Sequence, residues 1–211
     1  TAVAFAGDGQ RMFTGSPDGV IQIWSNEGTA VRTISTQGQA SQGAALSPNG
    51  ISLAVVTGTD IQNAQLRLYN VNTGNELWAK NLNNESRGNW GTKLDSVSFS
   101  GDNHFILVTS HNEDIQVNQG YADDRRYTSE ARNASFRAVD GQYVHSWGVR
   151  GLVSEMHSAR PRLDEEGDSI FIATDRGMTR LPTTTETPIH WSPRILDEKG
   201  FDISGDGSRI A

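Results

Sequence analysis

Residues 3–24 read Val3-Ala-Phe-Ala-Gly-Asp-Gly-Gln-Arg-Met-Phe-Thr-Gly-Ser-Pro-Asp-Gly-Val-Ile-Gln-Ile-Trp24, which is three short apolar runs separated by two Asp-Gly pairs. Alternation of apolar and polar or small residues at period two predicts β-strands in the three runs. Asp and Gly tolerate the positive φ angles that tight hairpin turns need. The stretch therefore predicts an antiparallel sheet with tight turns at Asp8-Gly9 and Asp18-Gly19.

The first part of this pattern returns four more times along the chain. Its turn positions fall at residues 9, 50, 103, 167 and 207, so two of the four steps between them are close to forty residues. The other two steps are longer and match the same period with insertions. Self-similarity at such a period indicates a repeat architecture. The five copies are Val3–Gly9, Ala44–Gly50, Val97–Asn103, Pro161–Gly167 and Phe201–Gly207.

Each turn leads into further predicted strands. Second strands are nearly continuous in apolar residues, third strands alternate, and fourth strands are shorter, as at 11–14, 20–24 and 30–34. Four short strands in about forty residues are typical of a β-propeller blade. The predicted fold class is all-β, a β-propeller of four-stranded antiparallel blades. We expect four and a half blades, at residues 1–41, 42–93, 94–156, 157–199 and 200–211.

An incomplete ring leaves an open sheet edge, which invites pairing with another chain. We therefore expect a fragment of a six- to eight-bladed ring. The remaining blades of a longer chain, or a partner strand, would close it. A β-sandwich with regular strand spacing is the alternative fold. The repeated register of the turns counts against it.

The stretch 3–24 resembles a WD-repeat blade. Asp18-Gly19 matches that family's tight turn between the second and third strands, and Trp24 matches the tryptophan that closes the third strand. Ser25 stands where the family signature has Asp, and a Gly-His pair precedes none of the blades. The resemblance implies a divergent WD-repeat-like propeller that binds proteins through its loops.

Two further resemblances overlap with this one. The segments Asn72–Trp78 and Asp140–Trp147 resemble quinoprotein dehydrogenase propeller repeats, in which a turn glycine precedes a fourth strand ending in Trp. Residues 201–211 are similar to the repeats of Tol-type propellers. The quinoprotein resemblance implies an enzyme with a ligand site at the central axis. We take Asp18, Gly19, Trp24, Trp78, Trp147 and Trp191 as structural residues of turns and blades.

Composition excludes several classes of function. The 211 residues carry a net charge of −7, which disfavours nonspecific nucleic-acid binding. The chain has no cysteine, so disulfides, thiolate metal sites and cysteine nucleophiles are impossible. Apolar runs stay below the ~18 residues of a membrane span. The five histidines lack metal-site spacing, so we predict no catalytic residue, metal or cofactor. The compartment is not fixed, and a cytoplasmic one is favoured.

Residues 111–132 form a predicted 22-residue insertion between the second and third strands of the third blade. Loops longer than about 12–15 residues in compact domains are usually functional or disordered. This one is rich in tyrosine and arginine, which are enriched at protein contacts. The candidate partner-binding residues are Tyr121, Asp123, Asp124, Arg125, Arg126 and Tyr127. A solvated loop without a partner is the alternative.

A second candidate segment is 83–93, a polar and glycine-rich connection that contains Trp90. An exposed Trp90 would anchor a partner, whereas a buried one would cover the gap between adjacent blades. Together the two segments predict a noncatalytic protein-binding or scaffold module. The alternative is part of a propeller enzyme, of quinoprotein-like or hydrolase type, with a ligand at the central axis.

Overall fold

The structure is a computed structural model of residues 1–211. It describes residues 2–6, 9–36, 41–58, 63–85, 93–114, 128–152, 162–163, 169–174, 177–182 and 189–191. Within these ranges the chain forms sixteen strands and one four-residue helix. The strands make four antiparallel sheets of four consecutive strands each. The predicted all-β class and four-stranded blades are confirmed. Residues 200–211, the predicted half blade, lie outside the described residues.

The strands of each sheet follow one another in chain order. The first sheet holds β1 (Ala2–Phe5), β2 (Arg11–Gly15), β3 (Val20–Ser25) and β4 (Ala30–Ser35). The second holds β5 (Ser41–Leu46), β6 (Ser52–Thr57), β7 (Gln65–Asn70) and β8 (Glu76–Asn81), followed by α1 (Leu82–Glu85). The third holds β9 (Lys93–Phe99), β10 (Phe105–Asp114), β11 (Thr128–Arg137) and β12 (Tyr143–Leu152). The fourth holds β13 (Arg162–Leu163), β14 (Ser169–Thr174), β15 (Gly177–Pro182) and β16 (Ile189–Trp191).

A Ser-x-Asp/Asn sequence shapes three of the hairpin turns. In the β5–β6 turn the Ser47 hydroxyl donates to Asn49 Oδ1 at 2.8 Å, and the same oxygen accepts the Ile51 amide at 3.1 Å. Ser100 and Asp102 make the matching pair in the β9–β10 turn, at 2.6 Å. Such side chains replace backbone partners in the turn. Short polar residues thus close the hairpins that the apolar runs begin.

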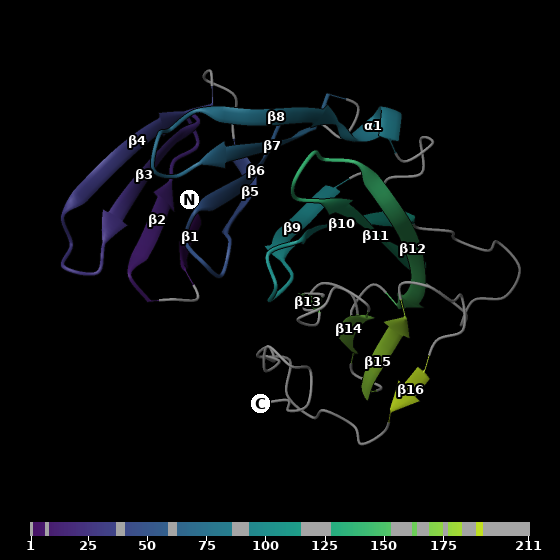
Figure 1. Cartoon of the computed structure of the whole chain (residues 1–211). Coiled ribbons are helices and arrows are strands. Elements are labelled where there is room, and N and C mark those ends of the chain that lie inside the picture. Colours follow the sequence, from purple (N-terminus) through teal and green to yellow (C-terminus); the bar gives the residue numbers. More distant parts are fainter. Residues whose placement is uncertain are drawn as a thin grey trace, which may run out of the picture.

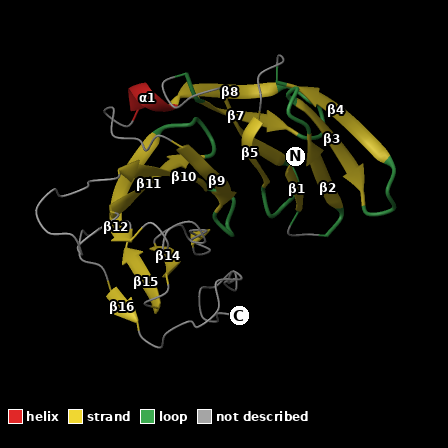
Figure 2. Ribbon diagram, turned by 180° about the vertical axis from the view of Figure 1, so that it is seen from behind, coloured by secondary structure: helices red, strands yellow, loops and turns green. Residues whose placement is uncertain are grey.

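The sheets stand side by side along an open arc (Figures 1 and 2). The first strand of each sheet contacts the first strand of the next, so β1, β5, β9 and β13 line the inside of the arc. The fourth strands lie on its outside. This is the arrangement of propeller blades rather than of two sheets stacked face to face, as in a sandwich.

The apolar core lies between neighbouring sheets. One cluster joins the first sheet to the second and includes Phe13, Ile23 and Leu53. Another joins the second to the third and includes Leu66, Ile106 and Phe136. Each of these six side chains is fully buried. The second sheet is therefore covered on both faces, which explains why its second strand, β6, is nearly continuous in apolar residues.

The third sheet differs from the sequence prediction. Residues 111–132 were expected to form one loop, and this was wrong at both ends. His111–Asp114 continue β10, and residues 128–132 belong to β11. The two segments pair in register from His111 with Ala131 to Asp114 with Thr128. β12 also continues past the predicted end at Trp147, as far as Leu152. The unpredicted strand ends are mostly polar or glycine, and their apolar residues are Ala131, Val149 and Leu152.

Candidate functional site at the extended end of the third sheet

The two segments singled out by sequence leave the sheets at the same end. Segment 83–93 leads from α1 into β9, and segment 111–132 comprises the end of β10, the β10–β11 connection and the start of β11. In an antiparallel sheet of consecutive strands these two connections fall at one end. Lys93, the first residue of β9, pairs with His111 of β10. The backbone therefore places the end of one segment directly beside the start of the other.

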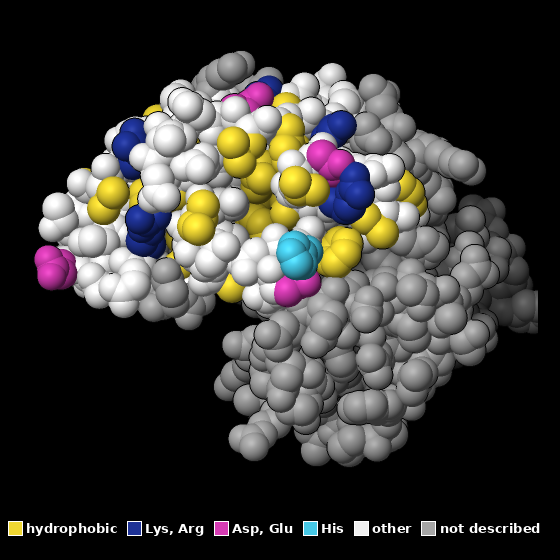
Figure 3. Space-filling view, viewed as in Figure 1, with side chains coloured by type: hydrophobic (Ala, Val, Ile, Leu, Met, Phe, Trp, Pro, Cys, Tyr) yellow, Lys and Arg dark blue, Asp and Glu magenta, His cyan; other side chains and the backbone are white. Residues whose placement is uncertain are grey.

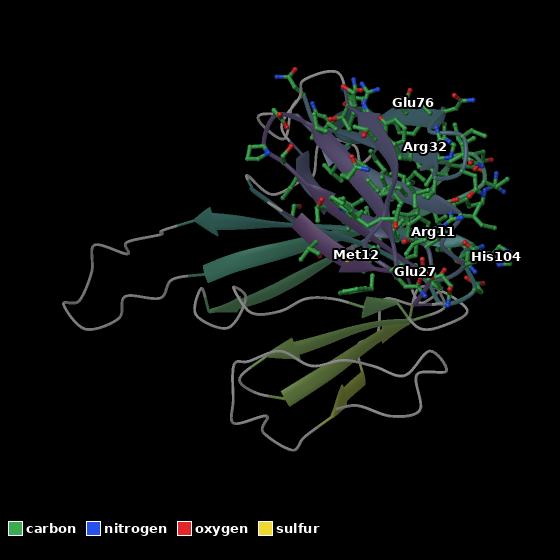
Figure 4. All side chains as sticks on the ribbon, turned by 90° about the vertical axis from the view of Figure 1, so that its left-hand side faces the viewer. Arg11, Met12, Glu27, Arg32, Glu76 and His104 are labelled. Atoms are coloured by element: carbon green, nitrogen blue, oxygen red, sulfur yellow. The ribbon has the colours of Figure 1, made fainter. Side chains whose placement is uncertain are left out.

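This end of the third sheet extends past the other sheets. β10, β11 and β12 are ten residues each, against six for β6, β7 and β8. Four additional residues at about 3.3 Å each extend a strand by roughly 13 Å. Figure 4 shows these strands running out at one side, while the labelled Arg11, Glu27 and His104 lie at the other. We call residues 111–114, 128–132 and 148–152 the extended end.

The predicted contact residues of these segments lie outside the described residues. They are Trp90, in the 86–92 gap, and Tyr121, Asp123, Asp124, Arg125, Arg126 and Tyr127, in the 115–127 gap. On either side of the 86–92 gap, the structure describes helix α1 and Lys93. On either side of the 115–127 gap it describes Asp114 and Thr128, which pair with one another. The structure fixes where the second segment is held, and its partner-binding role stays a prediction.

The opposite end of the sheets carries the turns within each hairpin, and we call it the turn face. It comprises the turns β1–β2, β3–β4, β5–β6, β7–β8, β9–β10 and β11–β12. In every one of the first three sheets a backbone hydrogen bond joins its two turns. The donors are the amides of Asn26, Val71 and Ala138, and the acceptors are the carbonyls of Gln10, Ile51 and His104. The turns of the turn face are thus connected to one another by backbone hydrogen bonds within each of these three sheets.

Side chains also link the turn face from sheet to sheet. Arg11 Nη1 donates to the Gly50 carbonyl at 3.0 Å, and Asn103 Oδ1 accepts the Asn49 amide at 3.0 Å. Ile51 and Val139 are exposed on this face, by 45% and 81%. Figure 3 shows hydrophobic side chains between charged ones across the described sheets. These apolar side chains sit on the face that carries no long insertion.

Two equivalent contacts join the last strand of one sheet to a turn of the next sheet. Arg32 of β4 donates to the Thr73 carbonyl at 3.1 Å and lies against Gly74. Trp78 of β8 donates from Nε1 to the Ala138 carbonyl at 2.9 Å and lies against Gly141. Arg32 and Trp78 occupy the same register position in their sheets, opposite Ile23 and Leu68. Sequence reasoning missed both contacts, although the recurring turn glycines were the available signal.

The predicted structural residues are placed as follows. Asp18 and Gly19 form the β2–β3 turn, where Gly19 has φ +83° and Asp18 Oδ1 accepts the Val20 amide at 3.2 Å. Trp24 donates from Nε1 to Thr14 Oγ1 at 2.9 Å. In the backbone register Trp78, Trp147 and Trp191 face Leu68, Asn133 and Met178. Trp78 and Trp147 therefore take different positions along their strands, unlike the repeated Trp of the quinoprotein pattern.

Hydrogen bonds lower the pKa of two carboxyl groups on the turn face. Arg137 donates to Asp140, and this contact is the main cause of the lowered pKa of Asp140. Burial is the largest single influence on Asp102 and raises its pKa. Donors on Ser100 and His104 outweigh burial and keep the Asp102 pKa below its ordinary value. Both carboxylates stay ionised at neutral pH, each beside a basic side chain.

Two other kinds of site are absent from the part of the chain that the structure describes. Among the described residues, no group of three or more His, Asp or Glu side chains could hold a metal ion. Across the same part of the chain, no helix is long and apolar enough to span a bilayer.

Comparison with known proteins identifies the fold. No protein-family model matches the sequence, and no curated protein matches it. Among solved structures, the β-propeller domain of Swd1 from Myceliophteria thermophila matches 100% of this chain and 61% of its own, at 13% identity and a TM-score of 0.60. The hydrazine synthase of Kuenenia stuttgartiensis matches 99% of this chain and 66% of its own, at 14% identity and TM-score 0.63.

The WD40 domain of Toxoplasma gondii coronin is also similar. It matches 85% of this chain and 41% of its own, at 13% identity and TM-score 0.54. The chain thus spans 41% to 66% of the three solved chains that it resembles. Identities this low carry information about fold alone. With the sheet order and the neighbouring first strands, they identify the fold of the chain as a β-propeller, the fold of the Swd1 and coronin domains.

Proposed function

We propose that this chain is a noncatalytic protein-binding module whose partner docks at the extended end of the third sheet. The observation that carries the proposal is the pairing of Lys93 with His111. This pairing holds the ends of segments 83–93 and 111–132 side by side on one sheet. Neighbouring segments presented together can form one continuous surface, whereas separate loops would each contact a partner alone.

The extended end suits binding because it is built from strands. Ten-residue strands paired in register hold the base of the insertion in a fixed place. Sites carried by strands are positioned more accurately than sites carried by loops alone. Rigid scaffolds that carry variable connections are a common basis for recognition. In the proposal Trp90, Tyr121, Arg125 and Arg126 are the anchors, because aromatic and arginine side chains dominate binding energy at interfaces.

The test replaces residues 115–127 with a short Gly-Ser turn and leaves β10 and β11 intact. Wild-type and variant protein are immobilised and exposed to an extract of the natural source, and captured proteins are quantified by mass spectrometry. We expect capture of a specific partner to fall at least about tenfold, since the lost segment holds several anchors. A Val139→Asp variant, altered on the opposite turn face, is the matched control and should capture normally.

Lysine cross-linking locates the contact independently. The sequence has three lysines, and among the described ones Lys93 pairs with His111 at the extended end. We expect amine-reactive cross-links to join the partner to Lys93 and to disappear in a Lys93→Arg variant. Equal capture by the shortened variant, or loss of capture only in Val139→Asp, would refute this placement.

A further inference from the structure

The β5–β6 turn carries a pair of residues whose chemistry the binding role does not use. Asn49 and Gly50 are the one Asn-Gly pair in the sequence, and Asn49 is exposed. An asparagine followed by glycine is prone to deamidation, because glycine has no side chain to hinder attack by its own backbone nitrogen. The turn face therefore holds a candidate site of covalent modification.

Deamidation at this pair needs only water as a co-reactant. The Gly50 backbone nitrogen gives up its proton and attacks Cγ of Asn49, so that a nitrogen–carbon bond forms and a succinimide ring closes. The side-chain carbon–nitrogen bond breaks, and ammonia leaves with the proton. Water then opens the ring at either carbonyl, which yields aspartate or isoaspartate at position 49.

The closed turn withholds the attacking nitrogen. The Gly50 amide donates to the Ser47 carbonyl at 2.8 Å, and attack on Asn49 requires that this hydrogen bond be broken first. Asn49 Oδ1 accepts the Ser47 hydroxyl at 2.8 Å and the Ile51 amide at 3.1 Å, which fixes the side chain. These donors polarise the carbonyl carbon, but polarisation accelerates attack only when a nucleophile is oriented toward that carbon. Reaction at Asn49 therefore requires that the turn open.

Contacts from both neighbouring sheets hold the turn closed. Arg11 of the first sheet donates to the Gly50 carbonyl at 3.0 Å, and Asn103 of the third sheet accepts the Asn49 amide at 3.0 Å. Both contacts end on the reacting pair itself. Opening the turn breaks them, so the chemistry at Asn49 is coupled to the packing of three sheets.

Asn103 occupies a position that glycine takes in the other two sheets. It has φ +68°, and the matching residues are Gly9 and Gly50, with φ +66° and +68°. A side chain in this left-handed region costs free energy that glycine avoids. The hydrogen bond from the Asn49 amide is the contact that a glycine at position 103 would lose. The Asn103 side chain thus lies where it stabilises the neighbouring turn.

The third sheet shows which product the turn can accept. Asp102 in the β9–β10 turn holds the position of Asn49, and its Oδ1 accepts the Ser100 hydroxyl at 2.6 Å and the His104 amide at 2.9 Å. Aspartate at position 49 therefore keeps the same hydrogen bonds. Isoaspartate instead carries the main chain through Cβ and Cγ, which lengthens the backbone and moves the oxygen that closes the turn. Isoaspartate is therefore incompatible with the closed turn.

We propose that Asn49 is a conditional modification site, which stays unmodified while the β5–β6 turn is closed and deamidates when the turn opens. Local opening takes less free energy than global unfolding. Isoaspartate keeps the turn from closing again, so a transient opening becomes a permanent loss of contacts among the first three sheets. The site lies on the turn face, and it is independent of partner binding at the extended end.

The test follows deamidation at Asn49 by peptide mapping and mass spectrometry during incubation at physiological temperature and pH. The folded protein is compared with the same chain in guanidinium chloride. We expect deamidation to be at least about tenfold slower in the folded protein, since only the open fraction reacts. Ser47→Ala and Asn103→Gly each remove hydrogen bonding that closes the turn, and each should raise the rate in the folded protein by about two- to tenfold.

Ser16→Ala is the matched control, because Ser16 donates to Asp18 in the same way in the β2–β3 turn, at the other end of the sheets. It should leave the rate at Asn49 unchanged. Equal rates in the folded and unfolded chain would overturn the proposal, as would unchanged rates in both Ser47→Ala and Asn103→Gly. An increase in Ser16→Ala as large as that in Ser47→Ala would show that global unfolding controls the reaction, and would overturn it too.

The effect of the two products is measured separately by urea unfolding at neutral pH. Asn49→Asp should unfold at the same urea concentration as the wild type, because Asp102 shows that the turn accepts a carboxylate. Chains with isoaspartate at position 49, isolated by chromatography, should unfold at a lower urea concentration. Equal midpoints for the aspartate and isoaspartate chains would contradict the permanent opening of the turn.

Discussion

At the level of single side chains, the turns of this protein depend on an oxygen two residues after a serine. Asp18 in the β2–β3 turn and Asn49 in the β5–β6 turn both accept the preceding serine hydroxyl. Each also accepts a backbone amide two residues further on. The amide oxygen of Asn49 therefore accepts the same two hydrogen bonds as the carboxylate oxygen of Asp18. The difference between them is charge, which only the carboxylate can lose on acidification.

Asp18→Asn should weaken the acid sensitivity of folding. The Ser16 hydroxyl, and next the Val20 amide, hold the pKa of Asp18 below its ordinary value of 3.8. A carboxyl whose pKa is lower when folded stabilises the protein above its unfolded pKa, and this contribution disappears as pH falls through the folded pKa. Urea unfolding midpoints from about pH 6 to about pH 2 should fall less steeply for the variant. Identical pH profiles would contradict this role.

Single residues also mark the limit of what the sequence can predict. The Asp18-Gly19 turn followed from local sequence, because turn chemistry is decided within four residues. The contact of Trp78 with the Ala138 carbonyl joins residues sixty positions apart. Its location depends on how two sheets pack, which residue periodicity does not encode. The sequence correctly suggested a structural Trp78 but not its partner.

At the level of strands and turns, contacts between sheets depend on glycine in the third sheet's last turn. A Cβ on Gly141 would lie 2.8 Å from Trp78 Cε3 and 3.0 Å from Lys80 Cγ. Its φ of +68° is also unfavourable for other residues. Gly28 has a similar φ of +79°, but nothing lies within 4 Å of the added Cβ. Substituting Gly28 therefore tests backbone strain alone, whereas substituting Gly141 tests backbone strain together with steric crowding by Trp78.

Gly28→Ala should cost about 1 kcal/mol of unfolding free energy, from backbone strain alone. Gly141→Ala should cost about 1–3 kcal/mol more, because Trp78 must move. Equilibrium denaturation of both variants measures the difference. Equal losses would show that Trp78 does not pack against Gly141.

Strand prediction succeeded where apolar alternation was strong and failed where it was absent. β6 and β7 were visible as Ser52–Thr57 and as residues 65–69, because burial on both faces requires apolar side chains. Residues 111–114 and 128–132 are mostly polar, so they were expected in a loop. They are strands because β10, β11 and β12 pair along ten residues. Backbone hydrogen bonds between neighbouring strands can extend a sheet without a hydrophobic pattern.

At the level of the whole molecule, stability depends on apolar side chains shared between sheets. Leu66 is fully buried in the cluster that joins the second and third sheets. Leu66→Ala should cost about 2–5 kcal/mol and lower the single unfolding transition of the described sheets. Leu77→Ala, at an exposed site, should change stability by less than about 0.5 kcal/mol. Similar effects of the two substitutions would refute a core shared between sheets.

The architecture was predictable from sequence because repetition reports it directly. Turn spacing and four strands per unit predicted blades, and the sheet order bears this out. The binding site was less predictable. The sequence identified two polar segments, but only the register places Lys93 beside His111. Register is a property of strand pairing over long separations, and no local pattern in either segment specifies it.

The most direct test of this account is amide hydrogen exchange along the third sheet, measured by mass spectrometry. The central claim is that residues 111–114 and 128–132 are paired strands that hold the binding segment in place. Their amides, where bonded between strands, should exchange far more slowly than those of an unstructured peptide, with protection approaching that of residues 105–110. Exchange at the unstructured rate from 111 through 132 would instead mean a single long loop, and it would remove the basis of the proposed binding surface.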